Sequence, residues 1–155
     1  LSLEVQRMPK DPKITFGHPA NYPYLSVATP SSHDTSTVRG WWEENPALSQ
    51  RFYNEILGNS FSSPFFCEPY IVKQIIVQHL YSPSMWAIFA IQDLLGIDGN
   101  LRLQDAGAER INNPGNPNHY WRYRMHLSIE DLLEQTWFNQ VLRDELKASG
   151  RMEIY

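Results

Sequence analysis

The sequence has little cysteine, no long apolar stretch and no concentration of positive charge, and each absence excludes a class of protein. Cys67 is the only cysteine among the 155 residues, so an internal disulfide is excluded and a reducing compartment, the cytoplasm, is expected. No apolar run reaches the roughly 18 residues of a membrane-spanning helix. The formal net charge is −4 and lysine and arginine do not cluster, which argues against a nucleic-acid partner.

The composition favours a folded domain that is rich in aromatic side chains. Hydrophobic residues make up 42% of the chain and charged residues 19%, so a packed core is feasible. Aromatic residues reach 13%, which suits a large core or a surface that stacks flat, hydroxyl-bearing ligands. The first residues lack the basic and apolar regions of a signal peptide. Because the chain begins at Leu1 rather than Met, we expect an internal piece of a longer protein.

Three segments have the pattern of β-strands. Leu1–Met8 alternates apolar and polar residues at its start, and Tyr24–Thr29 is mostly apolar until Pro30 ends it. Met85–Ile91 is a continuous apolar run, which is typical of a strand buried on both faces of a parallel sheet. The connection between the first two strands is too rich in proline for a helix.

Three helices are predicted between and after these strands. Apolar residues at four-residue spacing predict a helix over 46–57, with Asn45 as its N-cap. A second helix is predicted over 68–80. Ser128–Asp131 resembles a capping box and predicts a third helix that fades at Ser149. Strands that alternate with helices imply right-handed crossovers and a parallel sheet, so the fold class is α/β.

Residues that can do chemistry concentrate in the segment 31–42, directly after the second strand. His33 and Asp34 lie where a parallel strand of a barrel delivers side chains to the open end. The alternative interpretation is structural: Ser31 or Asp34 caps a following helix, and Trp41–Trp42 fills a core. A second polar segment is the long irregular loop from Asp105 to Trp121, whose length and amides favour a functional role.

Four motifs, taken together, resemble one enzyme family. They are Ser32–Trp42, Ala90–Gly96, Arg110–Gly115 and Trp121–Arg124, and they occur in the order found in the 4-α-glucanotransferases. This group, the amylomaltases and disproportionating enzymes, is family 77 of the glycoside hydrolases. The resemblance extends over almost the whole chain.

Further details resemble one branch of this family. Ser36 stands where most members have an acidic residue. With Gln6–Pro9 and Ser84–Phe89, it is similar to the disproportionating enzymes that use maltose. Those enzymes move a glucosyl unit from maltose to a glycogen-like or heteroglycan acceptor.

The resemblance implies a (β/α)8 TIM barrel, of which residues 1–155 would be a single fragment. That fragment would be the C-terminal portion, about strands 6 to 8 with their helices. The family uses a retaining mechanism, in which one carboxylate attacks the sugar and a second residue, about 5–5.5 Å away, serves as acid and then base. A sugar hydroxyl instead of water takes up the covalent intermediate, so the site must hold an acceptor and exclude water.

The resemblance also implies roles for four residues. Asp34 would be the third carboxylate of the site, which stabilises the transition state by accepting hydrogen bonds from the donor sugar. His33 would donate to a hydroxyl of the same sugar, and Asn112 would bind substrate through its amide. Arg39 is expected to bind substrate or to pair with a site carboxylate, with a scaffold ion pair as the alternative. No cofactor is expected.

Other residues keep two interpretations. Gln92 and Asp93 either face the cavity or lock neighbouring loops. Trp121 and Arg124 either support their loop or take part in binding, in which case Trp121 stacks on a sugar. Cys67 lacks the electropositive setting of a reactive thiol. The histidines outside the motif have no metal-ligand spacing, so no metal site is predicted.

The expected partners are maltose, maltodextrin or a glycogen-like glucan. The nucleophile and the acid/base of the family lie on earlier strands, so we expect this chain alone to lack transferase activity. Two alternatives remain: a non-catalytic carbohydrate-binding module, and an α-amylase-like glucan hydrolase. Because both edge strands would lack a neighbour, self-association of the fragment is also expected.

Overall fold

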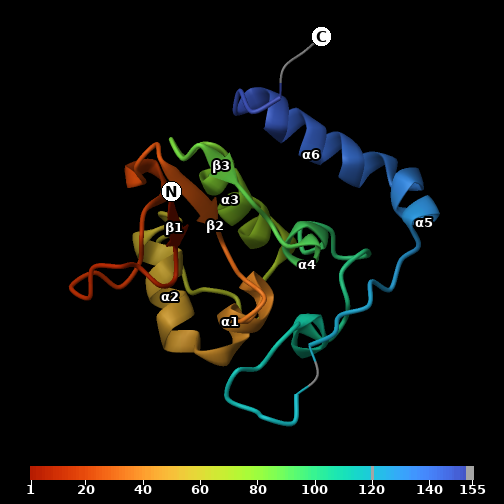
Figure 1. Ribbon diagram of the computed structural model, residues 1–155, viewed down its shortest axis with the longest axis horizontal. Coiled ribbons are helices and arrows are strands. Elements are labelled where there is room, and N and C mark those ends of the chain that lie inside the picture. Colours follow the sequence, from red (N-terminus) through yellow and green to blue (C-terminus); the bar gives the residue numbers. More distant parts are fainter. Residues whose placement is uncertain (120, 153–155) are drawn as a thin grey trace.

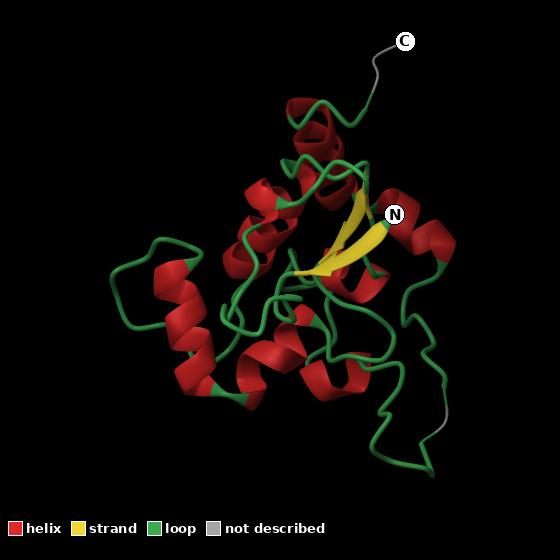
Figure 2. Cartoon of the chain, turned by 60° about the vertical axis from the view of Figure 1, so that its left-hand side comes forward, coloured by secondary structure: helices red, strands yellow, loops and turns green. Residues whose placement is uncertain are grey.

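A three-stranded parallel sheet lies at the centre of the computed structural model, which describes residues 1–119 and 121–152. The strands are β1 (Ser2–Val5), β2 (Ser26–Thr29) and β3 (Trp86–Ala87), and β2 lies between the other two. Figure 2 shows the strands beside one another with helices around them. The predicted α/β class with parallel strands is confirmed.

The prediction of a strand over Met85–Ile91 is wrong in two respects. Only Trp86 and Ala87 pair with β2, and Ile91 already begins the short helix α4 (Ile91–Leu95). Nor is the run buried on both faces, since Trp86 and Ile88 are 53% and 55% exposed. An apolar run without alternation fits the interior of a sheet or the start of a helix equally well. In the part of the chain that the structure describes, no further strand pairs with β3.

Helices follow the strands along the chain and surround the sheet (Figure 1). Within residues 1–119 and 121–152, none of them is long and apolar enough to cross a membrane. Besides α4, the helices are α1 (Val38–Glu44), α2 (Pro46–Glu55), α3 (Pro69–Leu80), α5 (Ile129–Glu134) and α6 (Thr136–Ala148), with the 3-10 helices η1 (Pro19–Asn21) and η2 (Ala106–Glu109).

Side chains that cap the first turn set where the predicted helices begin. The Asn45 side chain accepts a hydrogen bond from the backbone N–H of Leu48 at 3.1 Å. Ser128 and Asp131 form the predicted capping box at the start of α5. Both predicted starts are confirmed. After α2 the chain turns at Gly58, whose φ of 70° is a conformation that favours glycine.

The sequence patterns missed one helix and one break. α1 begins after Thr37, whose hydroxyl accepts from the N–H of Gly40 at 3.2 Å, so Thr37 caps it in place of Ser31 or Asp34. The single C-terminal helix of the prediction is divided into α5 and α6 at Gln135, where ψ of 73° leaves the helical region.

The core lies where α1, α2 and α3 meet. Trp42 and Phe52 are fully buried, and their ring centroids lie 6.5 Å apart in an edge-to-face contact. Trp42 also donates from Nε1 to the carbonyl of Pro64 at 3.0 Å. Trp41 packs against the same cluster, which confirms the core interpretation of the tryptophan pair. These contacts anchor α1 directly after the loop of residues 30–37.

His79 is the one histidine on the buried face of α3. Its Nδ1 lies 2.7 Å from the carbonyl oxygen of Ile75. Burial lowers the pKa of His79 to about 4, with a smaller contribution from the charge of Arg7. An imidazole in the unfolded chain titrates near pH 6.5, so the unfolded state binds more protons between these two values.

We therefore expect stability to be lost as the pH falls from about 6.5 towards 4, by up to roughly 1.4 kcal/mol per pH unit from this group. Replacing His79 with Leu should remove this contribution, which is measured as the difference between wild-type and variant urea-unfolding free energies across that range. The comparison is needed because burial raises the pKa of Asp93 and Glu109, which gives a slope of opposite sign. The same substitution at the exposed His18 is the control, and an equal effect there would contradict the assignment.

Candidate functional site

The loop of residues 30–37 carries His33 and Asp34 at the C-terminal end of β2. A small turn shapes it: the hydroxyl oxygen of Thr35 accepts from the backbone N–H of Ser32 at 2.9 Å, and the N–H of Thr35 donates back to the carbonyl of Ser32 at 3.2 Å. The two residues enclosed by this turn project outwards. The side chain of His33 is 56% exposed and that of Asp34 is 47% exposed.

Three of the four predicted site residues come together at Asp34. One carboxylate oxygen, Oδ1, accepts from the side-chain amide of Asn112 at 2.7 Å. The other, Oδ2, lies 3.2 Å from Nε2 of His33. Asn112 belongs to the loop that follows η2 and is only 4% exposed, so a buried amide orients an exposed carboxylate.

Arg39, the fourth predicted site residue, lies elsewhere. Its guanidinium is buried in an ion pair with Glu109 and donates to the carbonyl of Leu103 at 2.8 Å. Of the two alternatives, the scaffold ion pair is therefore the one that the structure contains, and Arg39 does not pair with Asp34. The pair ties α1 to η2, and so connects the two loops that supply Asp34 and Asn112.

Gln92 and Asp93 lie in the first turn of α4 and lock neighbouring loops. Asp93 is buried and accepts from the hydroxyl of Ser31 and from the backbone N–H of Val38, the latter at 2.8 Å. Gln92 donates to the carbonyl of Glu109 at 3.2 Å. Burial raises the pKa of Asp93, while the hydrogen bonds and the charge of Arg7 act in the opposite direction.

Arg110 forms a second connection between the two loops. Its Nε donates to the carbonyl of Asn112 at 2.8 Å and its Nη1 to the hydroxyl of Ser36 at 3.1 Å. Ser36 in turn donates to Glu44, which lies 3.6 Å from Arg110. A hollow of about 240 Å³ beside this group is lined by residues of α1 and η2, among them Glu43, Glu44 and Ala106.

The aromatic motif after the loop contributes one side chain to the site. Trp121 is 62% exposed, and its ring centroid lies 5.1 Å from that of His33. Arg124 is exposed, and position 120, directly before Trp121, lies outside the described residues. Cys67 is buried, and burial raises the pKa of its thiol. Among the described residues, no group of three His, Cys, Asp or Glu could hold a metal ion.

Arg7 is a site-supporting residue that sequence reasoning missed. It follows β1 and donates to the loop of residues 30–37 from all three of its nitrogens. No local signal marked it, because the sequence pattern places position 7 inside the predicted strand Leu1–Met8. Glu109 carries no local signal either, since its partner Arg39 is 70 residues away.

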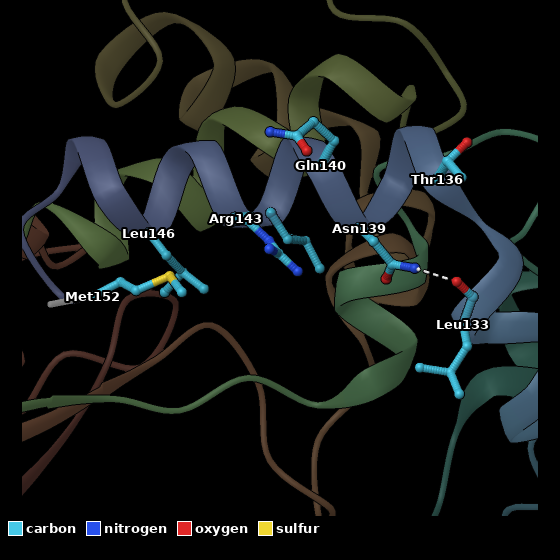
Figure 3. Close-up of a pocket in the computed structure, with 8 residues that line it drawn as sticks. Leu133, Thr136, Asn139, Gln140, Arg143, Leu146 and Met152 are labelled. Atoms are coloured by element: carbon cyan, nitrogen blue, oxygen red, sulfur yellow. Dashed lines mark hydrogen bonds between the residues drawn. The ribbon is translucent and has the colours of Figure 1, made fainter. Parts of the chain in front are cut away.

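A larger cavity, of about 580 Å³, lies along α6 and away from this loop (Figures 1 and 3). Its lining is mainly apolar, with Leu133, Leu146 and Met152 at its wall and Arg143 as its charged residue. The side chain of Asn139 is turned to the carbonyl of Leu133 at 3.3 Å. No carboxylate lines this cavity.

The arrangement at Asp34 can orient and bind hydroxyl groups. One carboxylate is accessible and accepts a hydrogen bond from the buried amide of Asn112, and an imidazole and an indole lie beside it. Asp93 and Glu109 are buried and engaged in hydrogen bonds, so neither is available as a nucleophile or a proton donor. A double displacement needs two such groups flanking the sugar.

Comparison with known families matches residues 1–129 to the model of the 4-alpha-glucanotransferase family, glycoside hydrolase family 77. The 4-alpha-glucanotransferase DPE2 of Oryza sativa subsp. japonica is 41% identical over 151 residues, which is 97% of this chain and 16% of the relative. A 4-alpha-glucanotransferase of Chlamydia trachomatis is 34% identical over 122 residues, or 78% of this chain and 23% of the relative.

Among solved structures, the amylomaltase from Streptococcus agalactiae in complex with acarbose matches with a TM-score of 0.62 and 21% identity. The match covers 87% of this chain and 24% of that structure. At this identity the likeness concerns the fold alone. The chain thus spans less than a quarter of the length of the relatives that it matches.

The Arg39–Glu109 pair generates a test of how the two loops are held. Replacing Arg39 with Met leaves Glu109 buried without its partner and is expected to cost about 3–5 kcal/mol of unfolding free energy, measured in urea. Adding Glu109→Gln should recover part of this loss, because the uncompensated charge is removed.

Arg51→Met is the matched control, since Arg51 forms an exposed pair with Glu55. That change is expected to cost less than about 1 kcal/mol. Equal losses from the two arginine variants would show that burial of the Arg39 pair has no special importance.

Proposed function

Because the chain belongs to the 4-alpha-glucanotransferase family, we propose that it forms the C-terminal part, about strands 6 to 8, of the (β/α)8 catalytic barrel of such an enzyme. Three parallel strands with helices between them support this placement. So does the position of Asp34, at the C-terminal end of β2, since barrel enzymes carry their active sites at that end of their strands.

The reaction that we propose for the whole protein is the retaining transfer of glucosyl or maltooligosaccharide units between α-1,4-glucans. Asp34 accepts hydrogen bonds from hydroxyls of the donor ring, and these strengthen as positive charge develops in the transition state. His33 donates to a hydroxyl of the same ring, and the Asn112 amide holds Asp34 in place. The observation that carries the proposal is this exposed carboxylate, which the buried amide of Asn112 orients.

Maltose, maltodextrin or a glycogen-like glucan is the proposed substrate, with the maltose-using branch favoured. Ser36, Gln6–Pro9 and Ser84–Phe89 support that branch. A cytoplasmic location is proposed as well, supported by the free thiol of Cys67.

A carbohydrate-binding module is the second candidate. Exposed Trp121 beside His33 favours it, because an aromatic face next to hydroxyl-binding groups suits sugar stacking. Titration of the chain with maltodextrin separates the two candidates: saturable binding by the chain alone supports the module, and no binding supports a part of a catalytic barrel.

The catalytic proposal is tested in a chimera, in which this chain replaces the matched segment of the rice relative. The chimera should release glucose from maltose in the presence of glycogen, and Asp34→Asn should lower kcat by about 100- to 1,000-fold, since one charged acceptor of the transition state is lost. The chain alone should release none above the blank. Asp144→Asn, on the exposed face of α6, is the control. An unchanged kcat for Asp34→Asn would refute the assigned role.

Self-association is the expected behaviour of the isolated chain. Among residues 1–119 and 121–152, β1 and β3 each pair on one edge only, and Leu3 and Trp86 are more than half exposed. Sedimentation velocity should give an average mass that rises above 18.0 kDa with concentration. Leu3→Lys should lower this tendency because charge on an edge strand opposes pairing. A constant monomer mass at all concentrations would contradict the expectation.

A further inference from the structure

Arg7 lies beneath the loop that carries His33 and Asp34. Its Nε donates to the carbonyl of Pro30 at 3.1 Å, on the β2 side of the loop. Its Nη2 donates to the carbonyl of Ser36 at 2.7 Å and contacts the hydroxyl of Thr35 at 3.4 Å. The acceptors therefore flank His33 and Asp34 on both sides.

The partners of Arg7 are unusual for a partly buried arginine. Carbonyl and hydroxyl oxygens of one loop receive its hydrogen bonds, and no carboxylate pairs with it among the described residues. The ring of Trp41 covers the guanidinium at 5.2 Å from its centroid. Although burial lowers the pKa of Arg7 to about 10, the side chain stays charged at neutral pH.

The guanidinium is a rigid planar fork, so its bonds fix the distance between the two ends of the loop. Asp93 acts at the same ends from the side of α4, through Ser31 and Val38. Between these contacts, the carboxylate of Asp34 accepts from the amide of Asn112 and lies 3.2 Å from Nε2 of His33. The direction in which Asp34 projects thus depends on where the loop ends are held.

We propose that Arg7 is a positioning residue for the His33–Asp34 pair, and its catalytic consequence rests on the proposed function. Its hydrogen bonds go to the loop of residues 30–37 and stabilise one conformation of it, whereas Ile75 and Ile76 of α3 lie in the core. Loss of the fork releases the loop, and the Asn112–Asp34 hydrogen bond is then made only part of the time.

The first test uses the chain itself and follows side-chain amide exchange by NMR. In Arg7→Met the amide of Asn112 should exchange at least about tenfold faster, while backbone amides of Ile75 and Ile76 in α3 keep their wild-type rates, as expected for local opening. Arg7→Lys, which keeps the charge but loses the fork, should lie between. If Arg7→Met does not fold, Arg7→Lys carries the same test.

Arg51→Met is the matched control, because it also removes one positive charge and a guanidinium that covers an aromatic ring, that of Phe16 at 5.9 Å. It should leave Asn112 exchange unchanged. If the amide of Asn112 exchanges faster only by the same factor as the backbone amides of Ile75 and Ile76, the variant is generally destabilised and the proposal is overturned. Wild-type exchange of the Asn112 amide in both Arg7 variants would overturn it as well.

The second test measures kinetics in the chimera with the rice relative. A loosened Asp34 should lower kcat by about 100-fold with KM changed far less, since a misplaced group acts on the transition state. A rise in KM of about 100-fold with kcat unchanged would overturn the positioning role. An inactive parent chimera would count against the proposed function, whereas the exchange measurement would still decide the role of Arg7.

Discussion

The candidate site depends on one constraint: the segment of residues 30–38, which connects β2 to α1, is held by the positive side chain of Arg7 and by the negative side chain of Asp93. Arg7 binds carbonyls at both ends of this segment, and Asp93 accepts from Ser31 and Val38. Ordering a loop costs roughly 1–2 kcal/mol per residue in backbone entropy, so an exposed pair such as His33 and Asp34 needs such contacts to keep one orientation. The packing of α1 through Trp42 makes the far end of the segment rigid.

Features with a signal within a few residues could be predicted from the sequence. Asn45 and Ser128 cap helices as their neighbours indicated, and His33–Asp34 follows a strand as expected. The contacts that hold the site join residues far apart in the chain: Arg7 and Ser36 are 29 positions apart, and Asn112 and Asp34 are 78 apart. No local pattern carries such a pairing, and Asn112 was identified only through resemblance to a family. The partner of Arg39 had no signal of either kind.

The third strand shows why the fold was predicted better in class than in detail. Alternation of helices and strands determines a parallel sheet whatever the exact strand lengths. The apolar run from Met85 gives no boundary of its own, because both a buried strand and the first turn of a helix accept it. The end of β3 at Ala87 is decided by pairing with Ala28, and the start of α4 by the extended backbone at Ala90. The pairing and the backbone conformation that set these two boundaries cannot be predicted from the hydrophobicity of the residues.

Three carboxylates near the loop, those of Asp34, Asp93 and Glu109, differ in burial and in hydrogen bonding, and these differences decide which of them a ligand can reach. Asp93 and Glu109 are buried, which raises the pKa of each, and hydrogen-bond donors from α1 and its loop oppose that effect. Their oxygens are engaged in holding the chain and cannot reach a ligand. Asp34 remains half exposed because a single buried amide, from Asn112, is enough to orient it. In the role proposed for it, Asp34 must be both accessible and fixed, and buried side chains such as Asn112 and Asp93 hold it and its loop in place.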